Sequence, residues 1–477
     1  MRVLLIVPPN SQEERYGKLS NIGTLYPPLG LAYIAAVAEK EAQIKVIDGE
    51  AMNYSYKDIE NIAKEFKPDV VGMQTFCTTL NRCYKAAEIL KKLDKSIQIV
   101  LGGAQVTLEP KKTISNKNID FGIYGEGEIP FKNLLNHIKN KKKKSKEKKN
   151  KNRYSDIKGL IWKNKGKIKI NPPQELIKNL DELPLPARYL FPMEKYHSSA
   201  NLRGKRTLNI MTSRGCPYRC AYCAGSLIFG KTFRYNGTDK VIEELKELKE
   251  KYHADDIQFF DETFTANRQR VIDLCDKMIE NKLNVEWSCF TRVNLVDKEL
   301  LTKMKRAGCY QIFYGLESGV QRLLDLINKD ITLEQSRKAM KMTHEAGIET
   351  WVSFMLGLPS ETKEESEQTI KFAIEVDPTF VQFPITTPFP GTKLYELAGK
   401  YGKFLTTNMD DFTTWDSVVF VSNGRTPEDV KAVVRKAYRK FYLRPEYIIK
   451  RAKNILKLPP RKIINLIKSA ISTFIIK

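Results

Sequence analysis

The chain has 477 residues, 42% of them hydrophobic, which is enough for two or three hydrophobic cores at about one domain per 100–200 residues. This composition excludes a disordered chain. The net charge of +24 would suggest a nucleic-acid partner, but the block 139–153 alone carries ten positive charges and one negative charge. Such a block is typical of a solvated loop, with nucleic-acid contact and membrane or partner contact as the alternatives, and we expect no nucleic-acid partner.

Neither a secretory signal nor a membrane span is expected. The apolar stretch Met1–Val7 ends at Pro8-Pro9 and has the length of a strand, and no apolar run reaches the roughly 20 residues that cross a bilayer. Scattered cysteines without a CxxC pair argue against a disulfide framework: Cys77, Cys83, Cys275, Cys289 and Cys309. These features favour a reducing cytoplasm.

Short apolar runs alternate with helix-like stretches over residues 1–138. The runs are Val3–Val7, Ile44–Ile47, Val70–Met73, Ile97–Leu101 and Phe121–Tyr124, and the helical stretches are Leu29–Lys40, Lys57–Phe66 and Tyr84–Leu93. This alternation predicts a doubly wound parallel sheet, which binds ligands beyond the carboxyl ends of its strands. Two glycine-rich turns, Gly102-Gly103 and Gly125–Glu128, follow such strands. Neither is a GxGxxG fingerprint, and a purely structural turn is the alternative for each.

A lysine-rich loop and linker are predicted over 139–200. Ile157–Ile170 has the pattern of a small hairpin, and Leu183–Pro186 and Phe191-Pro192 provide the proline punctuation of a crossing segment.

Strands and helices alternate again over 201–424. The predicted strands are Leu208–Ser213, Ile257–Phe260, Val285–Thr291, Gln311–Gly315, Thr350–Leu356 and Phe380–Ile385, with helices such as Lys240–Tyr252 and Leu333–Ala346 between them. Six units are two short of a full eight-unit barrel. The expected fold class is therefore α/β, with an N-terminal doubly wound domain, a partial (β/α)6 barrel and C-terminal helices over 425–477.

Three cysteines lie in one short loop after the first barrel strand. Cys216, Cys220 and Cys223 are separated by three and two residues. Three thiolates suit a 4Fe-4S cluster, and they leave one iron open to an exogenous ligand. A zinc knuckle is the alternative, but zinc prefers four closed ligands and no fourth cysteine is adjacent.

The CxxxCxxC spacing, with the aromatic Tyr222 before the last cysteine, resembles the radical S-adenosylmethionine (radical SAM) enzymes. The resemblance implies that the open iron chelates the amino and carboxylate groups of SAM. In that family the cluster donates one electron, SAM splits, and a 5′-deoxyadenosyl radical removes a hydrogen atom from the substrate.

By the same resemblance, the ends of the predicted barrel strands bind SAM. Asp261 and Glu262 would lie near the amino group, Arg292 at the carboxylate, Glu317 and Ser318 at the nucleoside, and Gly357 beside the adenine. Each has a structural alternative: Asp261 caps the next helix, Arg292 forms a surface salt bridge, and the glycines only turn the chain.

Pro27–Leu31, Gly102–Gln105 and Gly125–Glu128 all precede the cysteine motif, and together they resemble the cobalamin-binding domain of cobalamin-dependent radical SAM enzymes. The implied cobalamin contacts are Gln74, Thr75, Gly102, Gly103, Gln105, Gly125, Glu126, Gly127 and Glu128. The DxHxxG motif of cobalamin mutases is missing, because Pro8–Gln12 follows the first strand. We expect no histidine ligand below the cobalt from any of His137, His197, His253 and His344.

The leading functional hypothesis is methyl transfer from methylcobalamin to an unactivated carbon or to phosphorus. The alternatives are an oxidative or ring-forming enzyme, similar to the anaerobic magnesium-protoporphyrin ester cyclase or to hopanoid-modifying enzymes, and a sensor module without turnover. A flavodoxin or ferredoxin is the expected electron donor, and the substrate is a small molecule or a lipid.

The tail reads as two helices, Tyr447–Leu458 and Arg461–Lys477. The second has a basic, amphipathic pattern. Packing on the barrel is one alternative, and a peripheral position in a membrane interface is the other.

Overall fold

The computed structural model describes residues 1–11, 14, 23–143, 153–197, 202–415 and 417–455. The chain forms two compact units. Unit 1 comprises Met1–Ser11, Pro27–Tyr196 and Ala224–Tyr235, and unit 2 comprises Gln12–Tyr26, His197–Cys223 and Asn236–Lys477. Each unit therefore contains a segment that is remote in sequence from the rest of it.

Unit 1 is built on a seven-stranded sheet in the order β2-β1-β3-β4-β5-β6-β7. Its strands are β1 (Arg2–Val7), β2 (Gln43–Asp48), β3 (Val70–Gln74), β4 (Gln98–Gly102), β5 (Phe121–Ile123), β6 (Leu160–Asn164) and β7 (Lys167–Ile170). The first five pair in parallel, in the 2-1-3-4-5 order of flavodoxin-like sheets, and β6 and β7 add an antiparallel hairpin at the edge.

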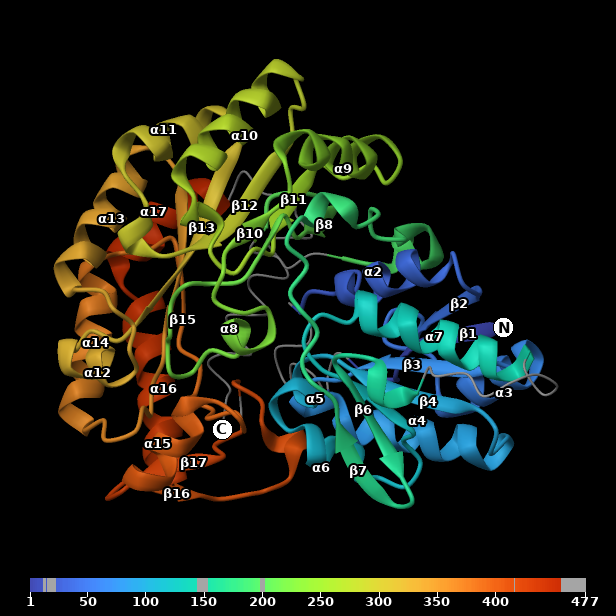
Figure 1. Cartoon of the computed structure of the whole chain (residues 1–477). Coiled ribbons are helices and arrows are strands. Elements are labelled where there is room, and N and C mark those ends of the chain that lie inside the picture. Colours follow the sequence, from blue (N-terminus) through green and yellow to red (C-terminus); the bar gives the residue numbers. More distant parts are fainter. Residues whose placement is uncertain (12–13, 15–22, 144–152, 198–201, 416, 456–477) are drawn as a thin grey trace. The chain divides into compact units, whose positions relative to one another are not determined.

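Helices cover both faces of this sheet because its parallel strands are apolar on both sides. The helices are α2 (Leu29–Ala38), α3 (Tyr56–Phe66), α4 (Leu80–Leu93), α5 (Ala104–Leu108), α6 (Pro110–Ile114), α7 (Glu128–Lys143) and α8 (Gly225–Ile228), with a short strand β10 (Arg234–Tyr235). Helices α2 and α7 pack together, as do α3 and α4 (Figure 1). A buried cluster that includes Leu4, Val71 and Leu101 joins the sheet to α3 and α4.

The predicted strands and helices of residues 1–138 are confirmed within a few residues. The predicted hairpin is also present, but its first strand pairs with β5, so the hairpin belongs to the unit 1 sheet. Sequence did not reveal this pairing because a strand's partner depends on chain segments far from it. The proposed division at 138, 200 and 424 stays a prediction.

Unit 2 contains a six-stranded parallel sheet in the order β15-β14-β13-β12-β11-β8. The strands are β8 (Thr207–Ile210), β11 (Asp256–Phe259), β12 (Glu286–Thr291), β13 (Cys309–Glu317), β14 (Glu349–Phe354) and β15 (Phe380–Gln382), and a short β9 (Ser213–Arg214) follows β8. Because β8 and β15 are edge strands, the sheet is the predicted partial (β/α)6 barrel.

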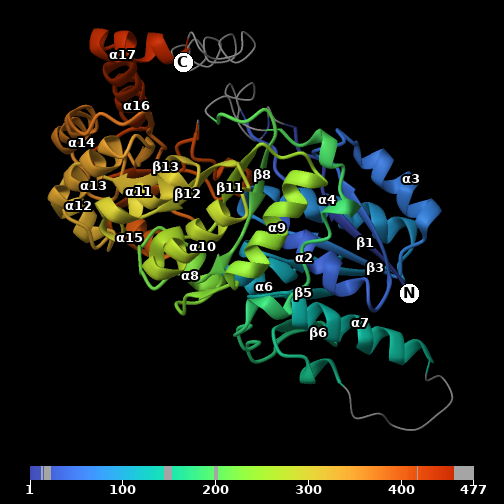
Figure 2. The ribbon, with the colours of Figure 1, turned by 90° about the horizontal axis from the view of Figure 1, so that it is seen from above.

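Crossover helices return the chain between these strands. They are α9 (Thr238–Glu250), α10 (Arg268–Glu280), α11 (Lys298–Arg306), α12 (Gln321–Leu326), α13 (Leu333–Glu345) and α14 (Lys363–Glu375). Helices α9, α10, α11 and α13 follow one another along the sheet in Figure 2. The strand side chains that pack under them, such as Trp287, Ile312 and Val352, are fully buried.

The C-terminal part adds α15 (Lys393–Tyr401), the hairpin β16 (Gly402–Phe404) and β17 (Phe420–Ser422), α16 (Pro427–Tyr442) and α17 (Pro445–Ile455). The predicted helix Tyr447–Leu458 corresponds to α17 as far as Ile455. The predicted amphipathic helix Arg461–Lys477 lies outside the described residues. In the described part of the chain, no helix is long and apolar enough to cross a membrane.

Candidate active site

The cysteine loop follows β8 and β9 at the carboxyl end of the barrel sheet. Cys216 and Cys220 are half-buried, and Cys223 is exposed. The Cys220 sulfur accepts a hydrogen bond from Arg292 Nη1 at 3.3 Å, and the Cys216 sulfur lies 3.4 Å from the Thr263 hydroxyl oxygen. The guanidinium thus places a positive charge beside the Cys220 sulfur.

All the remaining cysteines are buried: Cys77, Cys83, Cys275, Cys289 and Cys309. Burial raises the pKa of Cys83 to about 12 and shifts the pKa values of Cys275 and Cys289 well above their usual range. Cys83, Cys275 and Cys289 therefore stay as thiols, whereas iron binds thiolates. The accessible thiols are those of the loop, which fits a three-cysteine cluster site.

Asp261, which follows β11, fastens the start of the cysteine loop. Its Oδ1 accepts hydrogen bonds from the backbone N–H groups of Thr212 and Ser213 at 2.6 and 3.2 Å, and its Oδ2 accepts from the Thr212 hydroxyl at 2.6 Å. Arg270 on α10 lies 3.6 Å away and is also buried. Asp261 does not cap α10, whose N-cap is Asn267.

The contacts of Asp261 therefore give it a positioning role in the cysteine loop. Its neighbour Glu262 is half-buried, and the SAM contacts of both residues stay predictions. Thr212 and Arg270, the partners of Asp261, were not predicted, because no local motif distinguishes a buried threonine or a helical arginine.

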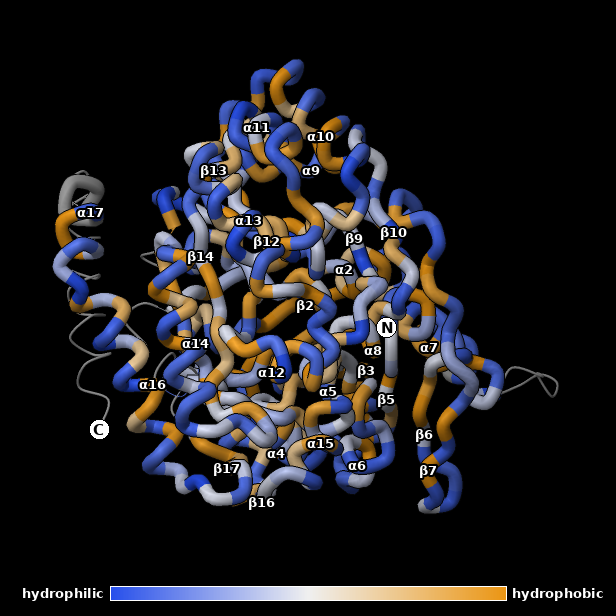
Figure 3. Tube along the Cα trace, turned by 90° about the vertical axis from the view of Figure 1, so that its left-hand side faces the viewer, coloured by the Kyte–Doolittle hydropathy of each residue, from blue (hydrophilic) through white to orange (hydrophobic). Residues whose placement is uncertain are grey.

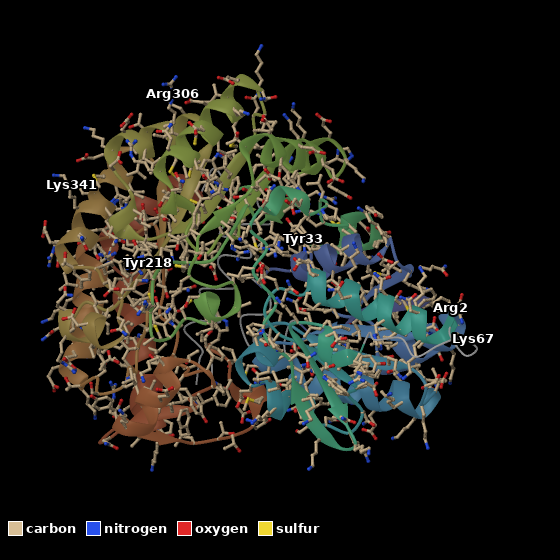
Figure 4. The ribbon with its side chains drawn as sticks, in the orientation of Figure 1. Arg2, Tyr33, Lys67, Tyr218, Arg306 and Lys341 are labelled. Carbon is tan, nitrogen blue, oxygen red and sulfur yellow. The ribbon has the colours of Figure 1, made fainter. Side chains whose placement is uncertain are left out.

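Arg292 ends β12 and is only 5% exposed, so the alternative of a surface salt bridge is wrong. Its guanidinium stacks 3.6 Å from the centre of the Tyr218 ring, which Figure 4 labels. It donates from Nε to Asn294 Oδ1 at 3.2 Å and from Nη2 to the Lys329 carbonyl oxygen. These bonds fix the guanidinium beside Cys220, and its contact with a SAM carboxylate stays a prediction.

Tyr222, Glu317 and Lys329 form a buried polar triad. The Tyr222 hydroxyl donates to Glu317 Oε1 at 2.8 Å, and Lys329 Nζ donates to the Tyr222 oxygen at 2.8 Å and to Glu317 Oε1 at 2.9 Å. Burial and the Glu317 carboxylate raise the pKa of Tyr222 well above its usual range, so the hydroxyl keeps its proton. Lys329 was not predicted, since a single lysine in a loop carries no sequence signal.

Glu317 also has unusual backbone geometry. Its φ angle is +65°, and the pairing of β13 with β14 shifts register between Gly315 and Glu317. A non-glycine residue with this φ is uncommon and persists where neighbouring contacts hold it. The ion pair with Lys329 is such a contact, and it supports the predicted functional role of Glu317.

Two further predicted residues lie on neighbouring strand ends. The Ser318 hydroxyl lies 3.2 Å from that of Thr369 and accepts from Val320 N–H at 3.1 Å, so it braces the turn into α12. Gly357 has φ +82° and donates its N–H to Glu361 Oε2, as does Leu358. The SAM contacts of Ser318 and Gly357 stay predictions.

Hydrogen bonds and a glycine turn connect the strand ends of unit 1, where the cobalamin contacts are predicted. Thr75 is fully buried and donates its hydroxyl to the Gly102 carbonyl oxygen at 2.8 Å, which joins the ends of β3 and β4. Gly103 has φ +95°, and a Cβ there would lie 2.8 Å from the Thr75 carbonyl oxygen. Only glycine fits this position. Gln105 is buried and donates to Glu109 at 2.7 Å, so its amide supports α5.

Glu126 forms a buried ion pair. Its side chain is 2% exposed, and both oxygens accept from Arg234 Nη1, at 2.8 and 3.0 Å. Glu126 Oε2 also accepts from Ile177 N–H at 2.8 Å, and Arg234 donates to the carbonyl oxygens of Ile177 and Phe229. Glu126 therefore anchors the segment after the cysteine loop to the rest of unit 1, and its contact with cobalamin stays a prediction. Cobalamin contacts also stay predictions for Gln74, Gly125, Gly127 and Glu128.

None of the four histidines follows a strand of the unit 1 sheet. His137 stacks on Tyr154 at the far end of α7, and His344 lies on α13. His197 pairs through its backbone with Leu25, and His253 follows α9. The absence of a histidine ligand to the cobalt therefore stays a prediction.

The carboxyl end of the partial parallel barrel thus carries three accessible thiols, a fixed arginine and the Tyr222–Glu317–Lys329 triad. This combination defines a radical SAM enzyme. The family model of the radical SAM superfamily matches residues 210–373. The family model of the B12 binding domain matches residues 18–135.

Relatives in sequence agree with this class. The chain is 39% identical to an uncharacterized methyltransferase of Pyrococcus horikoshii, over 94% of each chain. It is 27% identical to the cytidylyl-2-hydroxyethylphosphonate methyltransferase of Streptomyces wedmorensis, over 77% of each chain. It is 28% identical to the anaerobic magnesium-protoporphyrin IX monomethyl ester cyclase of Rubrivivax gelatinosus, over 94% of this chain and 78% of the relative. The chain belongs to the cobalamin-dependent radical SAM methyltransferase family.

Solved structures show the same fold. The radical SAM methyltransferase TsrM of Kitasatospora setae, with cobalamin and a [4Fe-4S] cluster bound, has a TM-score of 0.71 at 17% identity and covers 93% of this chain and 89% of its own. The cobalamin-dependent radical SAM enzyme OxsB has a TM-score of 0.74 at 15% identity, over 100% of this chain and 72% of its own. The cofactors are a 4Fe-4S cluster, SAM and cobalamin, as predicted.

Proposed function

We propose that this enzyme transfers a methyl group from cobalamin to an unactivated carbon or phosphorus atom of a small-molecule or lipid substrate. The observation that carries the proposal is the convergence of Arg292 on Cys220 beside the Tyr222–Glu317–Lys329 triad. When bound, the cluster and SAM supply one-electron chemistry that abstracts a hydrogen atom, and cobalamin supplies the methyl group.

The chain's own residues prepare this chemistry in defined ways. Arg292 places a fixed positive charge beside one cluster thiolate, which tunes its reduction and favours a carboxylate nearby. The Glu317 carboxylate keeps lone pairs for ribose hydroxyls or an ammonium group while Lys329 holds it in place. Tyr222 stays protonated and orients the same carboxylate.

Methyl transfer is supported by the relatives, since those of Pyrococcus horikoshii and Streptomyces wedmorensis are both named methyltransferases. The cyclase of Rubrivivax gelatinosus supports the alternative of oxidative ring formation without methyl transfer. The two reactions leave different products of SAM, so one experiment separates them.

The test is anaerobic reconstitution of the full chain with iron, sulfide and cobalamin, followed by reaction with SAM that carries a trideuterated methyl group. Small molecules and lipids of a cell extract serve as the substrate pool. We expect 5′-deoxyadenosine, S-adenosylhomocysteine and a deuterium-labelled product by mass spectrometry. The Cys220→Ala variant is the control and should give none of them.

Each alternative has its own outcome. Formation of 5′-deoxyadenosine without S-adenosylhomocysteine or label would support the cyclase-type reaction. Absence of 5′-deoxyadenosine under all conditions would support the sensor module.

We further propose two partners. A flavodoxin or ferredoxin supplies the electron, and omission of the reductant should abolish SAM cleavage.

The C-terminal helices contact membranes: Leu443, Ile448 and Ile449 are 50%, 51% and 68% exposed, and hydrophobic and hydrophilic residues alternate along α17 (Figure 3). Flotation with anionic liposomes, compared between the original chain and the variant Ile448→Glu/Ile449→Glu, tests this contact. Equal flotation of both chains would contradict it.

A further inference from the structure

A pocket lies in unit 1 between the end of α7 and the β6–β7 hairpin. Its volume is about 590 Å³, and its lining includes His137, Lys141, Arg153, Tyr154, Trp162 and Lys169. His137 and Lys141 are four residues apart on one helix and therefore share a face. Trp162 and Lys169 are directly paired across the hairpin.

A buried asparagine holds the pocket walls together. Asn171 is 7% exposed, and its Nδ2 donates to the carbonyl oxygens of Tyr154 and Ile157 at 2.6 and 2.8 Å. Its Oδ1 accepts from Trp162 Nε1 at 3.1 Å. Every hydrogen-bonding atom of the amide is thus used to join the turn at Tyr154 to the two hairpin strands.

Aromatic rings form the floor of the pocket. The Tyr154 ring lies 4.3 Å from the His137 ring and 5.7 Å from the Trp162 ring, centre to centre. Phe121 supports Tyr154 from below at 5.0 Å. Planar rings of this kind offer stacking surfaces to an aromatic ligand.

The rim is positively charged. Lys141, Arg153 and Lys169 are exposed, and none of the described residues that line the pocket carries a carboxylate. Asp156, next to the lining residue Ser155, accepts from Arg153 N–H and the Ser155 hydroxyl, which turns its carboxylate into the local turn. The His137 ring makes no hydrogen bond with any residue that the structure describes, and burial followed by the Lys141 charge lowers its pKa.

We propose that this pocket binds a nucleotide, with the base stacked on the Tyr154, His137 and Trp162 rings and the phosphates on Lys141, Arg153 and Lys169. Guanidinium and ammonium groups bind phosphate oxygens through charge-assisted hydrogen bonds, and cofactor pockets combine apolar walls with a few convergent polar groups. The site is independent of the methyl transfer reaction.

The test titrates the reconstituted full chain with ADP and follows binding by calorimetry. We expect the double variant Lys141→Glu/Lys169→Glu to bind ADP at least about tenfold more weakly, since two charge-assisted contacts become repulsive. The matched control is Lys95→Glu/Lys111→Glu, which makes the same charge change at exposed positions of unit 1 and should bind within about twofold of the original chain. Cobalamin loading and circular dichroism confirm that both variants fold.

A second readout is the His137 ring resonance, identified by its loss in His137→Gln. ADP should raise the pKa of His137, because a bound anion stabilises the imidazolium. Failure to bind ADP, equal affinity of the double variant, or equal affinity for inorganic phosphate and ADP would each overturn the proposal. Binding of single-stranded RNA in place of ADP would overturn it as well.

Discussion

The Lys329 ammonium is buried beside the Glu317 carboxylate and the Tyr222 hydroxyl, so one charge holds two side chains of the candidate active site. Lys329→Met would leave Glu317 as an unpaired buried charge at a residue with positive φ. We expect SAM cleavage to fall by roughly 10²-fold, because a small displacement of a positioning group has effects of that size.

The assay is 5′-deoxyadenosine formation at several SAM concentrations, which separates KM from the rate at saturation. Lys338→Met, at an exposed position of α13, is the control. Unchanged kinetics in the Lys329 variant would remove the positioning role.

The three loop cysteines should each be essential. Changing Cys216, Cys220 or Cys223 to alanine should abolish the visible absorbance of the cluster and all 5′-deoxyadenosine formation, since the other cysteines are buried thiols. Cys77→Ala is the control. A single loop variant that kept either signal would contradict the assignment.

Asp256 gives the stability of unit 2 a pH dependence. It is fully buried at the start of β11, and burial raises its pKa from 3.8 to about 6 despite hydrogen bonds from Thr207 and Tyr310. Between these values the folded chain binds more protons than the unfolded chain, so this group makes stability fall as the pH rises from about 4 to about 6.

The contribution is at most about 3 kcal/mol, at 1.36 kcal/mol per pKa unit. Urea unfolding at pH 4 and pH 7 measures it as the difference between the original chain and Asp256→Asn. We expect the variant to lose less stability over this interval. An identical pH profile in both chains would show that Asp256 ionises normally.

At the scale of elements, the Glu126–Arg234 pair joins the turn after β5 to the segment that contains α8 and β10. Removing one partner leaves a buried charge, so Glu126→Leu alone should destabilise unit 1 by about 3–5 kcal/mol, whereas Glu126→Leu/Arg234→Met should recover most of this loss. Thermal unfolding, with cobalamin binding as the second readout, checks both. A double variant as unstable as the single one would show that the pair is needed for more than charge balance.

The order of strands and helices could be predicted from hydrophobic periodicity, which is a local property of the sequence. Contacts between residues far apart in the sequence could not be predicted in this way. The ion pair of Glu126 could not be predicted, because its partner Arg234 lies 108 residues away in the sequence. Asp261 similarly points to Thr212, 49 residues back in the sequence. The three loop cysteines were predictable because all of them lie in one short segment with the CxxxCxxC spacing.

At the scale of the whole molecule, the fold predicts that no histidine coordinates the cobalt of bound cobalamin. No histidine follows a strand of the unit 1 sheet, so bound cob(II)alamin should show no nitrogen superhyperfine splitting in electron paramagnetic resonance. A clear nitrogen triplet would contradict this, and His137→Gln would then test the one histidine of unit 1.

The interleaved path of the chain through the two units limits the order in which they can form during synthesis. Unit 1 needs Arg234 to neutralise Glu126, and Arg234 is made after Cys216, Cys220 and Cys223. Domains generally fold as units while the chain emerges from the ribosome. The cobalamin-binding unit therefore closes only after Arg234 has left the exit tunnel, and the three cluster cysteines leave before it, so the nascent chain exposes its cluster ligands before its first unit is complete.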